Sequence, residues 1–161
     1  MKFAIAGGES NFGALFIAAF VLFAFLLAPF AFAAENLRLR EGISFVQDLD
    51  NGFPIVADNI DDMKVEAGKP SLIFFGASGD LNTNRQAKRL VDIHKRYQGK
   101  LKVILVDVDH PANQDAVKLI KTYYRGYIPL EVILDREGKM AASHVGELES
   151  GELKSKIEKV L

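Results

Sequence analysis

The chain of 161 residues contains no cysteine. This absence excludes disulfide bonds, thiolate nucleophiles, zinc sites with cysteine ligands and iron–sulfur clusters, and it also excludes lipid attachment through cysteine. It leaves the compartment open, because exported proteins often carry disulfides but do not require them. Any function of this chain therefore uses chemistry other than that of thiols.

The chain also lacks an excess of charge of either sign. Its 20 Lys and Arg residues nearly balance its 21 Asp and Glu residues, which gives a formal net charge of −1. A nucleic-acid-binding domain would be expected to carry clustered Lys and Arg on one face. We therefore expect no nucleic acid among the partners. The length suits one domain with a sizeable core.

Charge is missing altogether between Glu9 and Glu35. Residues 12–34 form an apolar run rich in Phe, Ala and Leu, which as a helix would extend about 34 Å and would cross a hydrocarbon core of about 30 Å. A buried core helix does not fit this run, because it is apolar on all sides. We expect residues 1–34 to be either a signal peptide or an N-terminal transmembrane anchor.

The end of the apolar run bears on this choice. Pro29 followed by Ala31-Phe32-Ala33 matches the small-x-small pattern of a cleavage site, which favours a signal peptide. The length of the run favours an uncleaved anchor. With either alternative we expect an exported protein, periplasmic or otherwise extracytoplasmic, that is secreted or held at the membrane by its N-terminal segment.

Past residue 34 the sequence alternates strand and helix patterns. Residues 35–52 are predicted to be a linker or extension, with a short strand or helix at 43–46 and a turn at 50–52. The pattern then predicts strands over 53–56, 71–75, 101–108, 130–134 and 140–145, and helices over 58–67, 81–97, 111–123 and from a cap at Ser150 to 161. The alternation favours parallel strands, and the closing hairpin favours an antiparallel edge.

Several segments in this order resemble the thioredoxin family. Phe75-Gly76-Ala77-Ser78-Gly79-Asp80-Leu81-Asn82-Thr83 resembles the family's Phe-Trp-Ala-x-Trp-Cys-x-x-Cys segment, and Tyr127-Ile128-Pro129 is similar to its Ile-Pro motif, whose proline is cis. The resemblance covers residues 53–161, a single domain. It implies an α/β thioredoxin-like three-layer sandwich with a mixed sheet, preceded in this chain by an N-terminal hydrophobic helix.

The resemblance fails at the redox positions. Asp80 and Thr83 stand where the family has its two cysteines, and neither can form a disulfide. The family's two tryptophans, its buried acid and the basic partner of that acid are replaced as well, at Gly76, Gly79, Phe74 and Leu105. The thiols and the pair that handles their protons are therefore lost together. The resemblance implies the fold without thiol–disulfide oxidoreductase activity.

The leading functional hypothesis is a protein-binding module with no enzymatic activity. In the thioredoxin fold the backbone before the cis-proline is exposed and pairs with an extended peptide, which makes Pro129 the first candidate. The candidate binding residues are Pro129, Ile128, Tyr127, Gly79, Asp80, Asn82 and Thr83. Three of them also have a plain structural role, since the bond before Pro129 can shape the loop that starts the next strand, Asp80 can cap a helix and Thr83 lies in its first turn.

Two other functions stay open. With residues 12–34 uncleaved, the chain would be an accessory subunit of a membrane protein complex. The other is a metal-dependent enzyme of another class, for which Asp107, Asp109 and His110 are the candidate ligands. Acids are ordinary at this strand end of the family, so we expect no metal and no other cofactor.

Overall fold

The computed structural model describes residues 35–161. The predicted signal peptide or hydrophobic helix over residues 1–34 lies outside the described residues. Among residues 35–161, no helix combines the length and the apolar character needed to cross a membrane.

The described residues form strands and helices that mostly follow the predicted order. The strands are β1 (Glu35–Leu39), β2 (Ile55–Asp58), β3 (Ser71–Gly76), β4 (Lys102–Asp107), β5 (Leu130–Leu134) and β6 (Met140–Val145), and the helices are α2 (Leu81–Arg96), α3 (Gln114–Tyr123) and α4 (Ser150–Glu158). The two last strands have the predicted bounds. Helix α3 begins three residues later than predicted, because Asn113 accepts from the backbone N–H groups of Asp115 and Ala116 as its N-cap.

The main sheet is mixed, as predicted. Its strand order is β4-β3-β5-β6, with β3 parallel to β4 and antiparallel to β5, and with β5 antiparallel to β6. The two central strands are buried on both faces. Such strands are expected to form continuous apolar runs, as β3 does in Leu72–Phe75.

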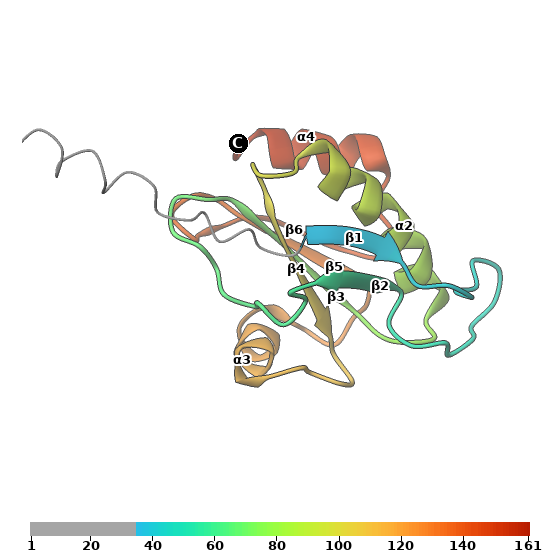
Figure 1. The fold of residues 1–161 in the computed structure, drawn as a ribbon. Coiled ribbons are helices and arrows are strands. Elements are labelled where there is room, and N and C mark those ends of the chain that lie inside the picture. Colours follow the sequence, from blue (N-terminus) through green and yellow to red (C-terminus); the bar gives the residue numbers. More distant parts are fainter. Residues whose placement is uncertain (1–34) are drawn as a thin grey trace, which may run out of the picture. The chain divides into compact units, whose positions relative to one another are not determined.

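Alternate side chains of β3 build two cores, one on each face of the sheet. Leu72 and Phe74 belong to a cluster that includes apolar residues of α2 and α4. Ile73 and Phe75 belong to a second cluster that includes Ala116 and other residues of α3. Figure 1 shows α2 and α4 on one side of the sheet and α3 on the other. Each of these large side chains stabilises the fold by about 1.5–3 kcal/mol on burial.

The N-terminal part of the domain differs from the prediction. Residues 35–39, predicted as linker, are the strand β1, which pairs antiparallel with β2 in a separate two-stranded sheet. Leu37 and Ile55 are buried in the core beside α2. The strand predicted over 53–56 lies at 55–58 and does not join the main sheet, and residues 43–46 form neither strand nor helix. The pairing of β1 with β2 depends on packing against α2, and no local sequence pattern predicts it.

The helix predicted over 58–67 does not form. Asn59 has a positive φ of 56°, which is incompatible with a first helical turn. Met63 is buried in the core beside α3, and the buried ammonium of Lys102 lies 2.8 Å from Asp62 and 3.0 Å from Glu66. These tertiary contacts override a modest helical propensity.

The predicted cap of the last helix is also wrong. Helix α4 begins at Ser150, and its N-cap is Glu149, whose side chain makes no capping hydrogen bond. The buried side chains of Leu153 and Ile157 hold this helix against α2 instead.

We predict that Lys102→Met loosens the segment that replaces the expected helix. The substitution keeps the apolar stem but removes the charge that pairs with Asp62 and Glu66, so the free energy of unfolding at pH 7 should fall by about 1–2 kcal/mol. The Lys102 hydrogen bond lowers the pKa of Asp62 from its usual value of 3.8. This stabilisation is present above that value and is lost as the pH falls through the lower folded pKa.

Urea unfolding at pH 7 and at pH 3 measures the effect. The difference in the free energy of unfolding between Lys102→Met and wild type should be smaller at pH 3 than at pH 7. A difference of the same size at both pH values would mean that Lys102 acts through packing rather than through its charge.

Candidate functional site

The residues singled out by the sequence lie at one end of the sheet. Leu130 pairs with Phe75, so Pro129 and Gly76 follow at the same end, where β3 leads into α2. The Ile128–Pro129 peptide bond is cis, as the resemblance implied. Pro129 itself is buried and Ile128 is half-buried, whereas Tyr127 is 67% exposed. Of these three residues, Tyr127 therefore presents an accessible side chain, whereas the proline ring does not.

The positions of the missing cysteines have structural roles. The carboxylate of Asp80 accepts from the backbone N–H of Thr83 at 2.6 Å, so Asp80 is the N-cap of α2. Thr83 is fully buried, and its hydroxyl accepts from the backbone N–H of Ala77 at 3.4 Å. A Cβ added at Gly76 would collide with the methyl group of Thr83, so the two positions fit together. Of the candidates on α2, only Asn82 is exposed.

The segment 41–52, predicted as linker, covers the start of α2. Asp48 accepts from the backbone N–H of Leu81 at 2.9 Å, and the carbonyl oxygens of Ser44 and Phe45 accept from the side chains of Asn84 and Arg85 at 3.0 and 3.2 Å. Two carboxylates thus satisfy the first amides of the helix, which leaves that helix end unsuited to an anion.

The same segment explains why position 79 is a glycine. Gly79 has a φ of 80°, and a Cβ there would lie 3.1 Å from the Cβ of Asp50. A side chain at this position would therefore be strained and would displace the covering segment. No pattern in residues 41–52 predicts this contact, because the partners are about 30 to 40 positions apart in the sequence.

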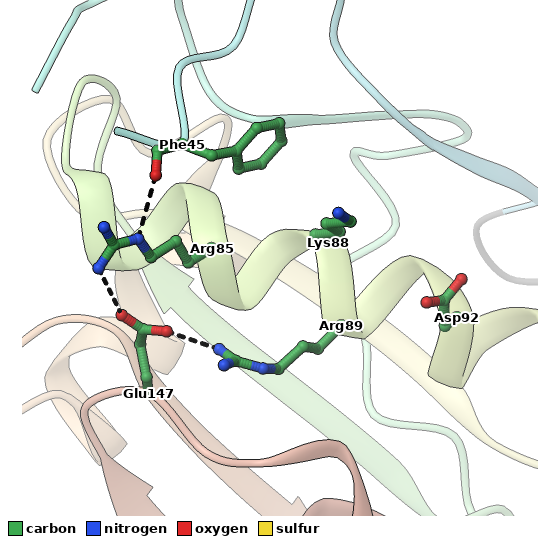
Figure 2. Close-up of a pocket in the computed structure, with 6 residues that line it drawn as sticks. All are labelled: Phe45, Arg85, Lys88, Arg89, Asp92 and Glu147. Carbon is green, nitrogen blue, oxygen red and sulfur yellow. Dashed lines mark hydrogen bonds and ion pairs between the residues drawn. The ribbon is translucent and has the colours of Figure 1, made fainter. Parts of the chain in front are cut away.

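An open groove of about 440 Å³ runs along the outer face of α2 (Figure 2). Its lining residues are Phe45, Arg85, Lys88, Arg89, Asp92 and Glu147. Arg85 and Arg89 lie 3.5 and 2.7 Å from the two carboxylate oxygens of Glu147, and Arg89 also lies 2.9 Å from Glu149. The Glu147 hydrogen bond raises the pKa of Arg89.

The charged groups in these ion pairs hold parts of the domain together and are not free to bind a ligand. Arg85 joins the covering segment 41–52 to the loop after β6, because it contacts both Phe45 and Glu147. The ammonium of Lys88 lies over the Phe45 ring, 5.7 Å from its centre. The groove on α2 is thus largely neutralised by its own side chains.

The sequence analysis did not single out one buried acid, Glu131. Glu131 lies within β5, opposite Phe74 on one side and His144 on the other, and is 1% exposed. Neither carboxylate oxygen has a hydrogen bond of ordinary geometry, and the same is true of the Nε2 of Gln86. Burial raises the pKa of Glu131 to about 8, although Gln86 and Arg89 partly oppose this shift. In the sequence, the feature that could have identified Glu131 is its position as the one charged residue in the apolar strand Leu-Glu-Val-Ile-Leu.

A second groove, of about 260 Å³, lies beside Tyr127 between α3 and the outer strands. Three exposed large apolar side chains line it, Tyr127, Met140 at 58% and Val145 at 52%. Scattered exposed apolar residues are ordinary, but a group of them around one hollow is characteristic of a binding surface. The guanidinium of Arg125 lies at its rim and has no ion pair among the described residues.

The candidate metal ligands form a turn. The carboxylate of Asp107 accepts from the backbone N–H groups of Asp109 and His110 and from the hydroxyl of Ser78. In the described part of the chain, no group of three or more His, Asp or Glu side chains is placed to hold a metal ion.

We predict that Glu131→Gln flattens the pH dependence of stability. The folded pKa is raised to about 8 from an unfolded value of 4.5, so folding binds a proton between these values and stability falls as the pH rises through them. The amide cannot ionise, and we expect it to stabilise the protein at pH 8 by on the order of 3 kcal/mol relative to wild type.

Urea unfolding from pH 4.5 to pH 8.5 tests this expectation. Glu152→Gln, at an exposed position of α4, serves as the matched control and should leave the profile unchanged. Parallel profiles for wild type and Glu131→Gln would contradict a buried protonated carboxyl.

Comparison with known proteins supports the fold. No protein-family model matches the chain, and no curated protein sequence matches it. Among solved structures, the chain is similar to the solution structure of an uncharacterized thioredoxin-like protein from Clostridium perfringens, with a TM-score of 0.51 and 20% sequence identity. The match covers 59% of this chain and 73% of that one. At this identity the similarity establishes a thioredoxin-like fold, and it establishes nothing about activity.

Proposed function

We propose that this chain, which has a thioredoxin-like fold and no cysteine, is an exported protein-binding module that holds an extended segment of a partner protein. The observation that carries the proposal is the apolar groove beside Tyr127. It extends along β5 and β6 from the end of the sheet that carries the candidate binding residues, and one of those residues, the exposed Tyr127, lines it.

The replaced redox positions support a role without thiol–disulfide exchange. Asp80 caps α2, Thr83 is buried against Gly76, and residues 41–52 cover the helix start. Catalysis of disulfide exchange needs a thiolate that can attack a disulfide sulfur, and no side chain of this sequence supplies one. Binding is the function that this end of the fold can still perform.

The groove suits an apolar side chain next to an acidic one. Tyr123, Leu130, Val132 and Met140 provide apolar surface, and the guanidinium of Arg125 at the rim can pair with a carboxylate. Large aromatic residues such as Tyr127 often dominate the binding energy of protein interfaces, because they bury much area with few rotatable bonds.

We predict that Tyr127→Ser weakens binding of the partner at least tenfold, about 1.4 kcal/mol, without lowering the melting temperature, because the side chain is exposed. The partner would be identified by co-purification with the wild-type chain, and its Kd would be measured with both purified proteins. Val46→Ser, which removes the side chain that is 84% exposed on the covering segment, is the control. An unchanged Kd for Tyr127→Ser would contradict the groove as the binding site.

Export is the part of the proposal that rests on residues 12–34. The Ala31-Phe32-Ala33 ending favours cleavage, whereas the length of the apolar run favours retention of a membrane anchor. A retained anchor would make the chain an accessory subunit of a membrane complex, with the same groove available.

We predict a mature chain that lacks about the first 33 residues. The intact mass of the protein isolated from its native host measures this directly. A mass that retains residues 1–33 would instead support the membrane-anchored subunit.

A further inference from the structure

The outer strand β6 has backbone groups that no other strand uses. It ends the strand order β4-β3-β5-β6, and in the described residues it pairs only with β5. Gly146, just after β6, donates its backbone N–H to the carbonyl of Pro129 at 2.8 Å. Hydrogen-bonded pairs alternate along an antiparallel ladder, so His144 also directs its backbone groups toward β5, whereas Ser143 and Val145 direct theirs away from the sheet.

Only the second half of β6 is regular enough to accept another strand. The register with β5 is continuous over residues 142–145 and then shifts, so Ala141 lies in a bulge. A bulge protects an edge from pairing, as charged side chains and prolines do. The continuous stretch contains no Lys, Arg, Asp, Glu or Pro, and its Ser143 and Val145 are exposed. These two residues are therefore the part of the edge that a strand can reach.

The same two residues line the groove beside Tyr127. Their partners on β5, Val132 and Leu130, belong to the core cluster that includes α3, so Ser143 and Val145 point to that face of the sheet. Side chains directly opposite each other on paired strands share a face. A strand added along β6 would therefore place two of its side chains, two positions apart in its sequence, over the groove.

The chemistry of the groove favours an acidic residue at one of these two positions. Among the described residues that line it, only Arg125 carries a charge. The guanidinium donates to the carbonyls of Tyr124 and Thr122 at 3.0 and 2.9 Å, which holds it in place and uses only some of its N–H groups. It has no ion pair in the described part of the chain, so its other N–H groups can bind a carboxylate.

The rest of the lining favours a large apolar residue at the other position. Tyr127, Met140 and Val145 are exposed, and the buried Leu130 and Val132 line the same hollow. An apolar side chain in the hollow would remove this surface from water, which is favourable.

We propose that the partner's segment binds as an added β-strand along Ser143 and Val145, with an acidic residue and a large apolar residue two positions apart that both face the groove. This inference rests on the proposed function and names the binding mode and the kind of segment. In strand addition, backbone hydrogen bonds supply affinity and alternate side chains supply specificity. Pro129 does not provide these bonds, because it has no backbone N–H and its carbonyl already accepts from Gly146.

A library of random peptides displayed on phage, selected on the full chain purified in detergent, supplies the probe. We expect the enriched peptides to combine an acidic residue with a large apolar residue two positions away. In the peptide that binds most tightly, each backbone amide is then N-methylated in turn. Every second N-methyl group should raise the Kd by roughly tenfold, because only alternate amides of an added strand face β6.

The ion pair with Arg125 is tested from both sides. Arg125→Gln should raise the Kd of this peptide by roughly tenfold. Lys121→Gln, at an exposed position of α3 outside the groove lining, is the control and should leave it unchanged. Replacing the acidic residue of the peptide by its amide should raise the Kd of wild type by a similar factor and have no effect on Arg125→Gln. The change in the peptide tests the same contact without any change in α3.

The outcomes distinguish this inference from the proposed function. Strand addition of an acidic segment is wrong if N-methylation has the same effect at every position, or if the amide peptide binds wild type as tightly as the acidic one, while Tyr127→Ser still weakens binding. The groove would then bind its partner in another way. If no peptide is enriched, or if Tyr127→Ser leaves the Kd of the peptide unchanged, the groove is not the binding site and both proposals fail.

Discussion

The strand β3 has to be buried on both of its faces, and most of the architecture follows from this requirement. Leu72 and Phe74 need cover on one side, and Ile73 and Phe75 need it on the other. Helices α2 and α4 supply the first cover and α3 the second (Figure 1). The strand lies between β4 and β5, which pair with its two edges. The end of β3 then fixes where α2 begins, and with it the candidate site.

The end of the sheet where β3 leads into α2 is closely packed. Phe74 completes the core where the family would bury an acid, and Thr83 occupies space that only a glycine at position 76 leaves free. The segment 41–52 adds carboxylate and carbonyl acceptors over the first turn of α2. Each replacement is consistent with the others, since a buried charge or a free helix end without a role would only cost free energy. Under the proposed function, this end would bind through shape and apolar surface, as in the groove beside Tyr127.

Glu131 is the exception to this packing rule. Glu131 pairs with Phe74 on the neighbouring strand, and its carboxyl lies close to Gln86 and Arg89 of α2. An apolar residue would be expected at such a buried position. A protonated carboxyl reduces the cost of desolvation, and this explains why the pKa of Glu131 is raised. The same face of α2 holds the ion pairs of Arg89 with Glu147 and Glu149. Hydrogen bonds connect Gln86 and Arg89 of α2 with the loop after β6, and Glu131 is buried without a hydrogen bond of ordinary geometry to this network.

The sequence alone determined the features that depend on neighbouring residues. Continuous apolar runs located β3 and β5, Asp80 located the start of α2, and the strand patterns over 130–134 and 140–145 located the final hairpin. The lack of cysteine excluded thiol chemistry without any structure. The tyrosine next to Ile128-Pro129 was also visible as a candidate, because the motif around it is local.

Only the tertiary structure decided the features that depend on distant contacts. Residues 58–67 have a helical pattern, yet Lys102 and the core hold them in an irregular path. Residues 35–39 carry no strong strand signal, yet Leu37 packs beside α2 and makes them a strand. Pro129 looked like an accessible contact and proved to be buried, whereas the groove beside Tyr127 arises from α3, β5 and β6 together. The physical reason is common to all three: local propensities differ by less than about 1 kcal/mol per residue, whereas one buried contact is worth about 1.5–3 kcal/mol.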